Sequence, residues 1–327
     1  MLRHTSLLVS LVLLIDRLPW PAEPTTRSRG RPKTYSDRLI LKALVVMIIR
    51  HLSTAYAFLT LLAQDDPVAQ QVRGLLREHG RFPTRRTWER RLAALPQPLP
   101  GLIGCFGRHL VAVLTPWASH GRAVAVDSTP WKTSGGVWHK KHKEQGEMPH
   151  TSIDTEAGWS QSGWHGWGYG WKLHLAVSGG SVWLPLAAAL TPANTADNTV
   201  APQLVAPLPA EMRSVLGDTH YNDPEVRTLC EQADRVLVAT RRGPYPHQDA
   251  GVEVRRIFYK LRSQAIEPFN GLCKNVFEWR TQMPVKGLQR SQLLALGAVV
   301  LYQLVLLYQY EQHLPLGTGI KPLLRAA

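Results

Sequence analysis

The sequence predicts an α/β protein in which an N-terminal helical region precedes a mixed sheet flanked by helices. Two observations support this fold class. Before residue 95 the apolar residues recur mainly at helical spacing, and after residue 122 the apolar runs follow the order three strands, helix, strand, helix, strand, helix. A Pro-rich break at residues 95–100 separates the two parts, so we expect a helical region over residues 1–98 and an α/β domain over residues 99–327.

The N-terminal region has the outline of a helix-turn-helix module. Apolar residues share one helical face over residues 37–62, a second helix is expected over residues 68–78, and a third begins at Arg85. Ser36 and Thr84 are the expected N-caps of the first and third helices. A tight turn followed by a basic helix is typical of this DNA-binding motif, although a solvated basic helix explains the same charges. The candidate DNA contacts are Arg85, Arg86, Arg90 and Arg91.

The first core strand ends at a carboxylate. Residues 123–126 have the pattern of a buried strand, and Ser128, Thr129 and Pro130 are expected to end it directly after Asp127. A carboxylate at the end of a buried strand is costly to ionise unless a cation, a protein base or a metal ion lies beside it. We therefore expect the functional site to form around Asp127.

Two later stretches supply partners for Asp127. A short strand over residues 212–217 leads to Asp218, and a predicted helix over residues 254–277 carries Glu267. Two strand-end acids and one helix acid can converge on a pair of divalent metal ions, which prefer carboxylate oxygens. Taken singly, Asp218 is better explained as a turn cap and Glu267 as a helix-surface charge paired with Lys274.

The strand that follows Asp127 in the chain carries two basic side chains. Residues 169–177 alternate as a strand with Lys172 and His174 on one face, and residues 182–190 form the next strand. With the strand before Asp127, these segments make a three-stranded meander. Lys172 and His174 would flank the predicted site and are candidate DNA contacts.

Residues 131–170 form an excursion that is rich in Trp, Gly, His and Lys and has little periodicity. Basic residues among aromatic ones suit a surface that holds a DNA backbone and stacks on a displaced or terminal base. The alternative is that the tryptophans pack the excursion onto the core, and for most of them we favour it. The histidine spacings in this segment match no standard zinc site.

The composition indicates a polyanionic partner. The 327-residue chain has 38 Lys and Arg against 24 Asp and Glu, a formal charge of +14, and residues 25–34 form a basic, Gly/Pro-broken arm. Apolar runs at residues 7–15 and 293–308 fall short of a membrane span and are expected to be a docking helix and a buried terminal helix. Three scattered cysteines without a CxxC pair indicate a reducing compartment.

Several short motifs occur in an order that resembles a known enzyme family. They are Val124-Ala-Val-Asp127-Ser-Thr, Gly168-Tyr-Gly-Trp-Lys172-Leu-His174-Leu, Thr191-Pro-Ala-Asn with Asp197, and Leu216-Gly-Asp218-Thr-His-Tyr221. A final set, Tyr259, Arg262, Glu267 and Lys274, is similar to a Tyr-Arg-Glu-Lys signature, except that the arginine stands one residue farther from the acid. Over roughly residues 122–310 the chain resembles DDE-type insertion-sequence transposases of the compact subgroup that lacks a large β insertion.

The resemblance implies an RNase H-like catalytic core, a mixed five-stranded sheet flanked by helices. It implies that Asp127, Asp218 and Glu267 bind two Mg²⁺ ions, for which Mn²⁺ can substitute. Glu278 is the reserve candidate for the third acid. The implied phosphate contacts near the cut DNA end are Tyr259, Arg262 and Lys274.

The implied activity is metal-dependent hydrolysis at the ends of an insertion element, followed by joining of the 3′-OH ends to target DNA. The implied partners are double-stranded DNA, as terminal inverted repeats and as target, and further copies of the chain in a homodimer or larger assembly. We expect a cytoplasmic, nucleoid-associated protein that does not bind a membrane. Two alternatives stay open, a metal-dependent nuclease with the same core and a catalytically silent DNA-binding repressor descended from a transposase.

Overall fold

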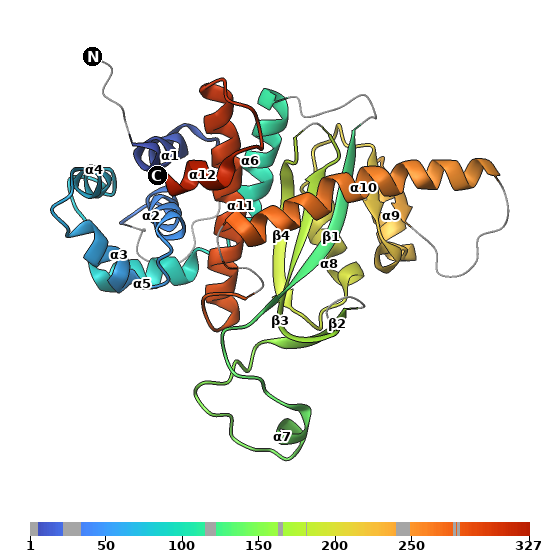
Figure 1. Ribbon diagram of the computed structural model, residues 1–327, viewed down its shortest axis with the longest axis horizontal. Helices are drawn as coiled ribbons and strands as arrows, with labels where there is room; N and C mark the ends of the chain where they lie inside the picture. Colours follow the sequence, from blue (N-terminus) through green and yellow to red (C-terminus); the bar gives the residue numbers. More distant parts are fainter. Residues whose placement is uncertain are drawn as a thin grey trace.

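A computed structural model of the chain describes residues 6–21, 34–114, 122–162, 166–180, 182–239, 249–276, 279 and 282–327. The side chains of residues 162, 249–259, 273, 275 and 276 also lie outside the description. Nearly all of the predicted basic arm, Glu278 and the side chain of Tyr259 therefore fall outside the described residues. Figure 1 shows a helical region beside a sheet that is crossed by one long helix.

The elements follow one another along the chain as Figure 1 labels them. The strands are β1 (Ala123–Lys132), β2 (Gly158–Ser162), β3 (Gly166–Ser178), β4 (Pro185–Pro192), β5 (Ser214–Gly217) and β6 (Val236–Ala239). The N-terminal helices are α1 (Leu7–Arg17), α2 (Asp37–Ile49), α3 (Ala55–Leu62), α4 (Pro67–Leu75) and α5 (Arg85–Ala94). The later helices are α6 (Leu99–Leu114), α7 (Lys140–Glu144), α8 (Asp197–Val205), the 3₁₀ helix η1 (Thr219–Tyr221), α9 (Pro224–Gln232), α10 (Asp249–Val276), α11 (Leu288–Glu311) and α12 (Ile320–Arg325).

The sheet has the mixed arrangement of the RNase H-like class. Strands β1, β3 and β4 form an antiparallel meander, with β3 in the middle. Strands β5 and β6 continue the sheet on the other side of β1, and both run parallel to it. Because parallel neighbours need crossover connections, α8 precedes β5 and α9 precedes β6 along the chain.

Two predictions about the sheet are wrong. It has six strands and not five, because the excursion contributes β2, which pairs with residues 166–170 of β3. Strand β1 also continues past Asp127 to Lys132 instead of breaking at Pro130. Strand β5 accompanies β1 only as far as Ala125, so Pro130 lies where one side of β1 has lost its partner strand. A sheet tolerates proline at such a position because no ladder hydrogen bond is lost there.

Helices α6 and α11 pack on β4, and α10 crosses β1, β3 and β5 (Figure 1). Helix α11 is long and apolar enough to span a membrane by length and composition alone. However, 89% of its most apolar window is buried inside the protein. The predicted buried terminal helix is therefore confirmed, and the predicted docking helix is α1, which packs on α2 and α11.

The N-terminal helices share one hydrophobic core with the sheet, since α11 contacts both α2 and β4. The predicted helix over residues 37–62 is divided into α2 and α3. Both predicted N-caps are confirmed, because the side chains of Ser36 and Thr84 accept hydrogen bonds from the backbone N–H groups of Leu39 and Thr87. Helix α3 contacts both α4 and α5, so the three short helices form one packed group. The predicted domain boundary at residues 98 and 99 stays a prediction.

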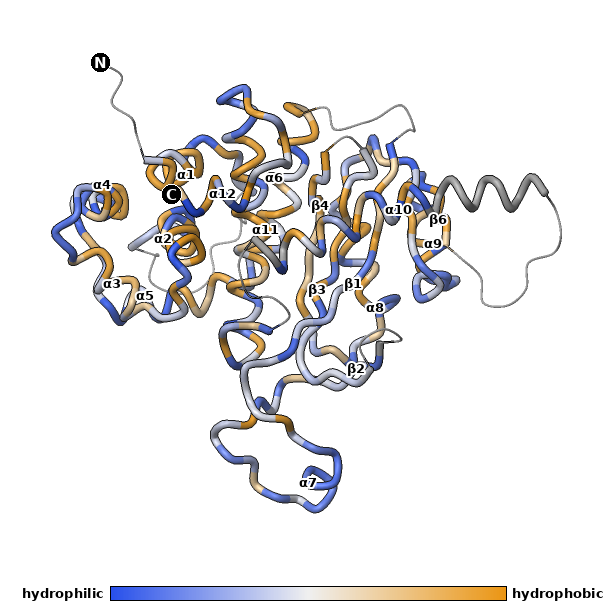
Figure 2. The backbone as a smooth tube through the Cα atoms, in the orientation of Figure 1, coloured by the Kyte–Doolittle hydropathy of each residue, from blue (hydrophilic) through white to orange (hydrophobic). Residues whose placement is uncertain are grey.

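The first part of the excursion projects away from the body and carries α7 near its tip (Figure 1). Figure 2 shows that α7 and its flanks are mostly hydrophilic. Asp154, which is buried, holds the base of this projection: its Oδ2 accepts hydrogen bonds from the Thr133 hydroxyl and from the Gly287 N–H just before α11. The hydroxyl of Tyr169 on β3 donates to the Asp154 carbonyl. The projection is therefore anchored to both the sheet and α11.

Candidate active site

Asp127 and Asp218 occupy matching positions on neighbouring parallel strands. The register of β1 and β5 pairs Ala125 with Leu216, and each aspartate lies two residues beyond its member of that pair. Side chains two residues apart point to the same face of a strand, and neighbouring strands are ~4.8 Å apart. The two carboxylates therefore meet where β1 and β5 separate. This is the strand-end convergence that the sequence predicts for these two residues.

The Asp127 carboxylate is mostly buried, with 19% of its side chain exposed. Its Oδ2 lies 2.8 Å from a guanidinium nitrogen of Arg262 on α10, and its Oδ1 accepts a 2.8 Å hydrogen bond from the Ser128 N–H. The pKa of Asp127 is raised to about 6: burial is the largest cause, Arg262 and the Ser128 N–H oppose it, and the nearby Asp218 and Asp197 charges add to it. The carboxylate thus lacks enough positive charge to offset its burial.

A third carboxylate, Asp197, lies beside this pair at the first turn of α8. Its side chain is 10% exposed, and its Oδ1 is 3.2 Å from Lys172 Nζ and 3.5 Å from His174 Nδ1. The Lys172 ammonium also donates to the Thr195 carbonyl. Lys172 and His174 were predicted to contact DNA, but the structure turns both of them inward, onto Asp197 and the loop before α8. Neither presents a free charge to a surface: their side chains are 16% and 0% exposed.

His174 is neutral in this environment. Its pKa is lowered to about 4: burial is the largest cause, the Asp197 charge opposes it, and the Lys172 charge adds to it. The Nε2 of His174 lies 2.9 Å from the Thr191 hydroxyl, and its Nδ1 lies 3.5 Å from Asp197 Oδ1. Among the described residues, three carboxylates in this cluster therefore face two cations, Arg262 and Lys172.

Tyr221, the last residue of η1, is buried beside the cluster. It is 1% exposed, and its hydroxyl has no hydrogen-bond partner among the described residues. Burial raises the pKa of Tyr221 well above its usual value, and the charges of Asp197, Asp127 and Asp218 raise it further. A Cβ at Gly217 would lie 2.7 Å from the Tyr221 Cβ, so glycine is required for this ring to pack beside the end of β5. Asp218 itself caps η1 by accepting from the His220 N–H.

The predicted third acid does not join this cluster. Glu267 lies on the exposed side of α10, whereas Arg262 faces Asp127. Five residues of α-helix turn the side-chain direction by roughly 140°, so the two residues cannot both face the same carboxylate. Ala265, Ile266 and Phe269 form the buried side of α10 here. Within the described part of the chain, no group of three or more His, Cys, Asp or Glu side chains is gathered closely enough to hold a metal ion.

The comparisons with known proteins agree with these motifs. A family model described as "Transposase DDE domain" matches residues 118–304, more than half of the chain and both strand-end aspartates. The chain belongs to the DDE-domain transposase family. A search of curated proteins finds no match.

Two solved structures are similar to this transposase-family chain at low identity. One is a "Mos1 transposase paired-end complex with left transposon end", with 13% identity and a TM-score of 0.23, covering 88% of this chain and 80% of that chain. The other is a "pre-cleavage Mos1 transpososome", with 12% identity and a TM-score of 0.19, covering 86% and 80%. At such TM-scores the superpositions are poor, so the fold assignment rests on the strand order described above.

The remaining predicted contacts of the transposase lie in different surroundings. Lys274, on α10, lines a pocket against β1 and β3, well away from Asp127. On α5, Arg85 pairs with Glu89 and lies over the ring of Tyr56, while Arg86 and Arg90 are exposed. The prediction for Arg91 is wrong. That side chain is 10% exposed and pairs with Asp37 of α2, because position 91 lies on the buried side of α5.

Sequence reasoning assigned no role to Asp197 and Tyr221, although both stand in the motifs that carry the family resemblance. Asp197 follows the Thr-Pro-Ala-Asn loop after β4, and Tyr221 follows Asp218 by three residues. The available signal for each was a polar side chain within the short segment that follows a strand. What the sequence could not supply was their burial, which makes Asp197 part of the charge balance around Asp127.

Proposed function

We propose that this transposase-family protein cuts DNA at the ends of its own insertion element and joins the resulting 3′-OH ends to target DNA. The observation that carries the proposal is the register-matched pair, Asp127 and Asp218, at the ends of parallel strands β1 and β5. Two carboxylates that meet at a strand end beside a surplus of negative charge fit a site for cations that engage phosphodiesters.

The proposed cofactor is a pair of Mg²⁺ ions, with Mn²⁺ able to substitute. The donor chemistry fits, because Asp127 and Asp218 offer hard oxygen ligands and the raised pKa of Asp127 reflects an unmet need for positive charge. Bound divalent ions would supply activation of a water or 3′-OH nucleophile and stabilisation of the leaving oxygen. The residues that would hold them first are Asp127 and Asp218, with Arg262 moving off the carboxylate to contact a phosphate.

Glu267 remains the proposed third acid, and Glu278 its reserve. For Glu267 to reach Asp127, this part of α10 must turn by roughly 140° or be rebuilt locally. Pro268, directly after Glu267, lies inside α10 and removes one helix hydrogen bond there. The helix is therefore weakened next to the residue that the proposal requires to turn.

The proposed partners are double-stranded DNA, as element ends and as target, and further copies of this chain on the DNA. The formal charge of +14 supports a polyanionic partner. The exposed Arg86 and Arg90 on α5 remain the proposed DNA contacts of the N-terminal region. The proposed location is the cytoplasm, in association with the nucleoid.

The test uses the gene with its native flanking DNA as a linear substrate. Purified protein is incubated with Mg²⁺ or Mn²⁺, the new 3′ ends are mapped, and Asp127→Asn and Asp218→Asn are assayed alongside. The proposal expects discrete, metal-dependent cuts at both flanks, followed by joined products, all absent in both variants. Cuts scattered along the DNA with no joined product would instead indicate a general nuclease.

One observation favours a second candidate, a catalytically silent DNA-binding descendant of a transposase. Arg262 occupies Asp127 Oδ2, and Glu267 lies on the other side of α10. A chain locked in this state would bind the flanks without cutting them. Tight, sequence-specific flank binding by the wild-type protein, with no cut at any Mg²⁺ or Mn²⁺ concentration, would favour this candidate over the transposase.

A further inference from the structure

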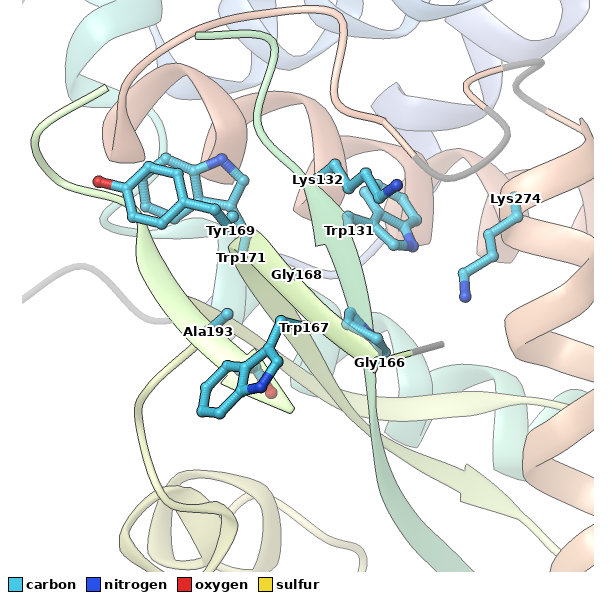
Figure 3. Close-up of a pocket in the computed structure, with 12 residues that line it drawn as sticks. Trp131, Lys132, Gly166, Trp167, Gly168, Tyr169, Trp171, Ala193 and Lys274 are labelled. Carbon is cyan, nitrogen blue, oxygen red and sulfur yellow. The ribbon is translucent and has the colours of Figure 1, made fainter. Parts of the chain in front are cut away.

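Helix α10 carries two cations that are predicted to contact DNA phosphates, and they lie in different surroundings. The Lys274 side chain extends from α10 into a pocket beside β1 (Figure 3). Arg262 is instead turned onto Asp127, with 2.8 Å between its guanidinium nitrogen and Asp127 Oδ2. The cation nearest to the proposed metal ligands is therefore held by one of them.

The contact with Arg262 occupies the carboxylate that a metal ion would need. Asp127 Oδ1 accepts a hydrogen bond from the Ser128 N–H and Oδ2 contacts Arg262, so each oxygen already has a partner. Mg²⁺ binds oxygen ligands at about 2.1 Å, so an ion on Oδ2 would lie within about 5 Å of the guanidinium nitrogen. Positive charges this close in a mostly buried site repel each other strongly. Arg262 and a divalent ion therefore compete for Asp127.

The charge balance of the cluster favours the divalent ion. Among the described residues, three carboxylates that carry three negative charges when ionised face two cations, Arg262 and Lys172. Replacing Arg262 by one divalent ion would leave these groups with no net charge. The single charge of a guanidinium is thus a poorer match to the cluster than a divalent cation.

Two polar groups of the cluster also lack partners while Arg262 is on Asp127. Arg262 Nε is buried and has no hydrogen-bond partner among the described residues. The Tyr221 hydroxyl is buried in the same way, and the charges of Arg262 and the three carboxylates all act on it. Buried polar groups without partners destabilise the state that contains them. The pairing of Arg262 with Asp127 is therefore one that a better-matched ligand can displace.

A phosphate is the anion best suited to take Arg262 away from Asp127. The guanidinium keeps its proton in a protein, so Arg262 is not released by losing its charge. It forms two parallel hydrogen bonds with phosphate oxygens, which makes a DNA phosphate a strong alternative partner. The side chains of Arg262 and Asp127 are 13% and 19% exposed, so the contact is partly open to solvent.

We propose that Arg262 closes the divalent-metal site while the protein is free of DNA, and opens it when a DNA phosphate replaces Asp127 as its partner. The inference rests on the proposed function, since it assigns a control to the same site. DNA and metal then strengthen each other's binding, because each favours the state in which Arg262 has left Asp127.

The first experiment measures Mn²⁺ binding to the DNA-free protein by isothermal titration calorimetry, so that it does not depend on cutting. Wild type is compared with Arg262→Gln, and Arg262→Met is a second uncharged variant should the first not fold. Arg227→Gln, on α9, is the matched loss of one exposed positive charge. The double variant Asp127→Asn/Arg262→Gln, compared with Asp127→Asn, shows whether any gain acts through Asp127.

We expect Arg262→Gln to bind Mn²⁺ about 10-fold more tightly than wild type, the factor for an Arg262 that occupies Asp127 about nine-tenths of the time. Arg227→Gln should differ from wild type by less than about 2-fold, because exposed charges are screened by solvent and salt. The double variant should bind Mn²⁺ no more tightly than Asp127→Asn.

The second experiment repeats the titration with a duplex of the cut element end. Its 3′ end lacks the hydroxyl, so it cannot be joined to other DNA. The duplex should raise the Mn²⁺ affinity of wild type, and by a smaller factor in Arg262→Gln, in which no guanidinium has to leave Asp127. An equal factor in both proteins would show that DNA does not act through Arg262.

The inference is overturned if neither Arg262→Gln nor Arg262→Met binds Mn²⁺ more tightly than wild type. It is also overturned if Arg227→Gln gains as much affinity, or if the gain persists in the Asp127→Asn background. The failure of the proposed function looks different. In that case the mapped 3′ ends show no discrete cuts at the flanks, whatever the Mn²⁺ affinity of the DNA-free protein.

Discussion

At the scale of single residues, the site is organised by an electrostatic conflict at Asp127. The carboxylate is buried, touches Arg262, and still has a pKa raised to about 6. The free-energy cost of burying the charged carboxylate therefore exceeds the stabilisation that Arg262 and the Ser128 N–H provide. Functional sites commonly carry such a cost, because a ligand or metal ion provides the missing charge only when it binds.

This conflict predicts that Asp127→Asn is more stable than wild type at neutral pH. A folded-state pKa of about 6 against a usual value of 3.8 means that ionising Asp127 destabilises the fold by up to about 3 kcal/mol once the pH exceeds 6. The penalty is absent below pH 3.8, so the gain from the substitution should shrink as the pH falls from 6 to 4. Urea unfolding of wild type and Asp127→Asn between pH 4 and about pH 7 measures this difference in stability. A variant less stable than wild type at pH 7 would mean that pairing with Arg262 outweighs burial.

The lowered pKa of His174 predicts that the free energy of unfolding changes with pH in the opposite direction to the Asp127 effect, over nearly the same pH range. Its folded pKa of about 4 lies below its usual 6.5, so the unfolded chain binds a proton that the folded chain rejects. Stability should be complete above pH 6.5 and fall by roughly 3 kcal/mol as the pH drops toward 4. Because Asp127 opposes this trend, the slope should be clearest when Asp127→Asn is compared with Asp127→Asn/His174→Gln by urea unfolding. Parallel curves for the two variants would show that His174 does not titrate as inferred.

The two aspartates were predictable from sequence, and the helix acid was the hard case. Asp127 and Asp218 each follow an apolar strand, and the two-residue period of a strand fixes which face they share. Glu267 depends on rotation about a helix. Relative to the family signature, one additional residue separates Arg262 from Glu267. It turns the Glu267 side chain by ~100° about the helix axis, so that Arg262 and Glu267 face different directions. The spacing is visible in the sequence, but the direction of Glu267 depends on the rotation of α10 relative to the sheet.

At the scale of elements, two carboxylates of the excursion between β1 and β3 accept hydrogen bonds from N–H groups at the N-terminus of α11. Asp154 Oδ2 accepts from Thr133 and from the Gly287 N–H, and Glu156 Oε2 accepts from the Leu288 N–H. Acceptors at a helix N-terminus satisfy N–H groups that have no partner within the helix. One segment thus fixes both the projecting arm and the position at which the core helix begins.

Asp154→Ala should therefore destabilise the fold much more than Glu156→Ala. Asp154 is 1% exposed, so its loss leaves the buried Thr133 hydroxyl and the part-buried Gly287 N–H without an acceptor and should cost about 2–4 kcal/mol. Glu156 is exposed, and water can replace its hydrogen bond, so we expect less than about 1 kcal/mol. Urea unfolding monitored by circular dichroism compares them. Equal losses would mean that the base of the excursion is not held through Asp154.

The sequence predicted correctly those features that depend only on neighbouring residues in the chain. It predicted poorly those that depend on pairing with another strand. The caps Ser36 and Thr84 are local, and both were predictable. Strand β2 depends on β3 as its template, and the continuation of β1 through Pro130 depends on where β5 ends. The burial of Arg91 could have been predicted, because Arg91 shares the helical face of Trp88 and Leu92 and that spacing is visible in the sequence.

At the scale of the whole molecule, α11 joins the N-terminal helices to the sheet. It packs against α2 on one side and β4 on the other, and its buried Gln303 donates to the carbonyls of Ile103 in α6 and Pro185 in β4. The sequence suggested two regions divided near residue 98. The spatial arrangement suggests that they are energetically coupled, and the coupling cannot be inferred from composition because it depends on which residues of α11 face α2.

Gly297 is the point at which this coupling can be tested. A Cβ there would lie 2.7 Å from Leu44 Cδ2 and 2.8 Å from Ile48 Cδ1 of α2, so Gly297→Ala should cost about 1–3 kcal/mol despite the better helix propensity of alanine. Gly101→Ala on α6 is the matched control, because nothing lies within 4 Å of its Cβ and propensity should stabilise it by up to about 1 kcal/mol. Urea unfolding gives both values.

Native-state hydrogen exchange then shows how far the strain at Gly297 spreads. If the helices and the sheet open as one cooperative unit, amides in α2, α11 and β3 should all lose protection by the same free energy in Gly297→Ala. Loss of protection confined to α2 and its neighbours would instead mark residues 1–98 as a separately stable unit. That result would support the predicted boundary, and it would mean that a DNA-induced movement of the N-terminal helices need not disturb the strands that carry Asp127 and Asp218.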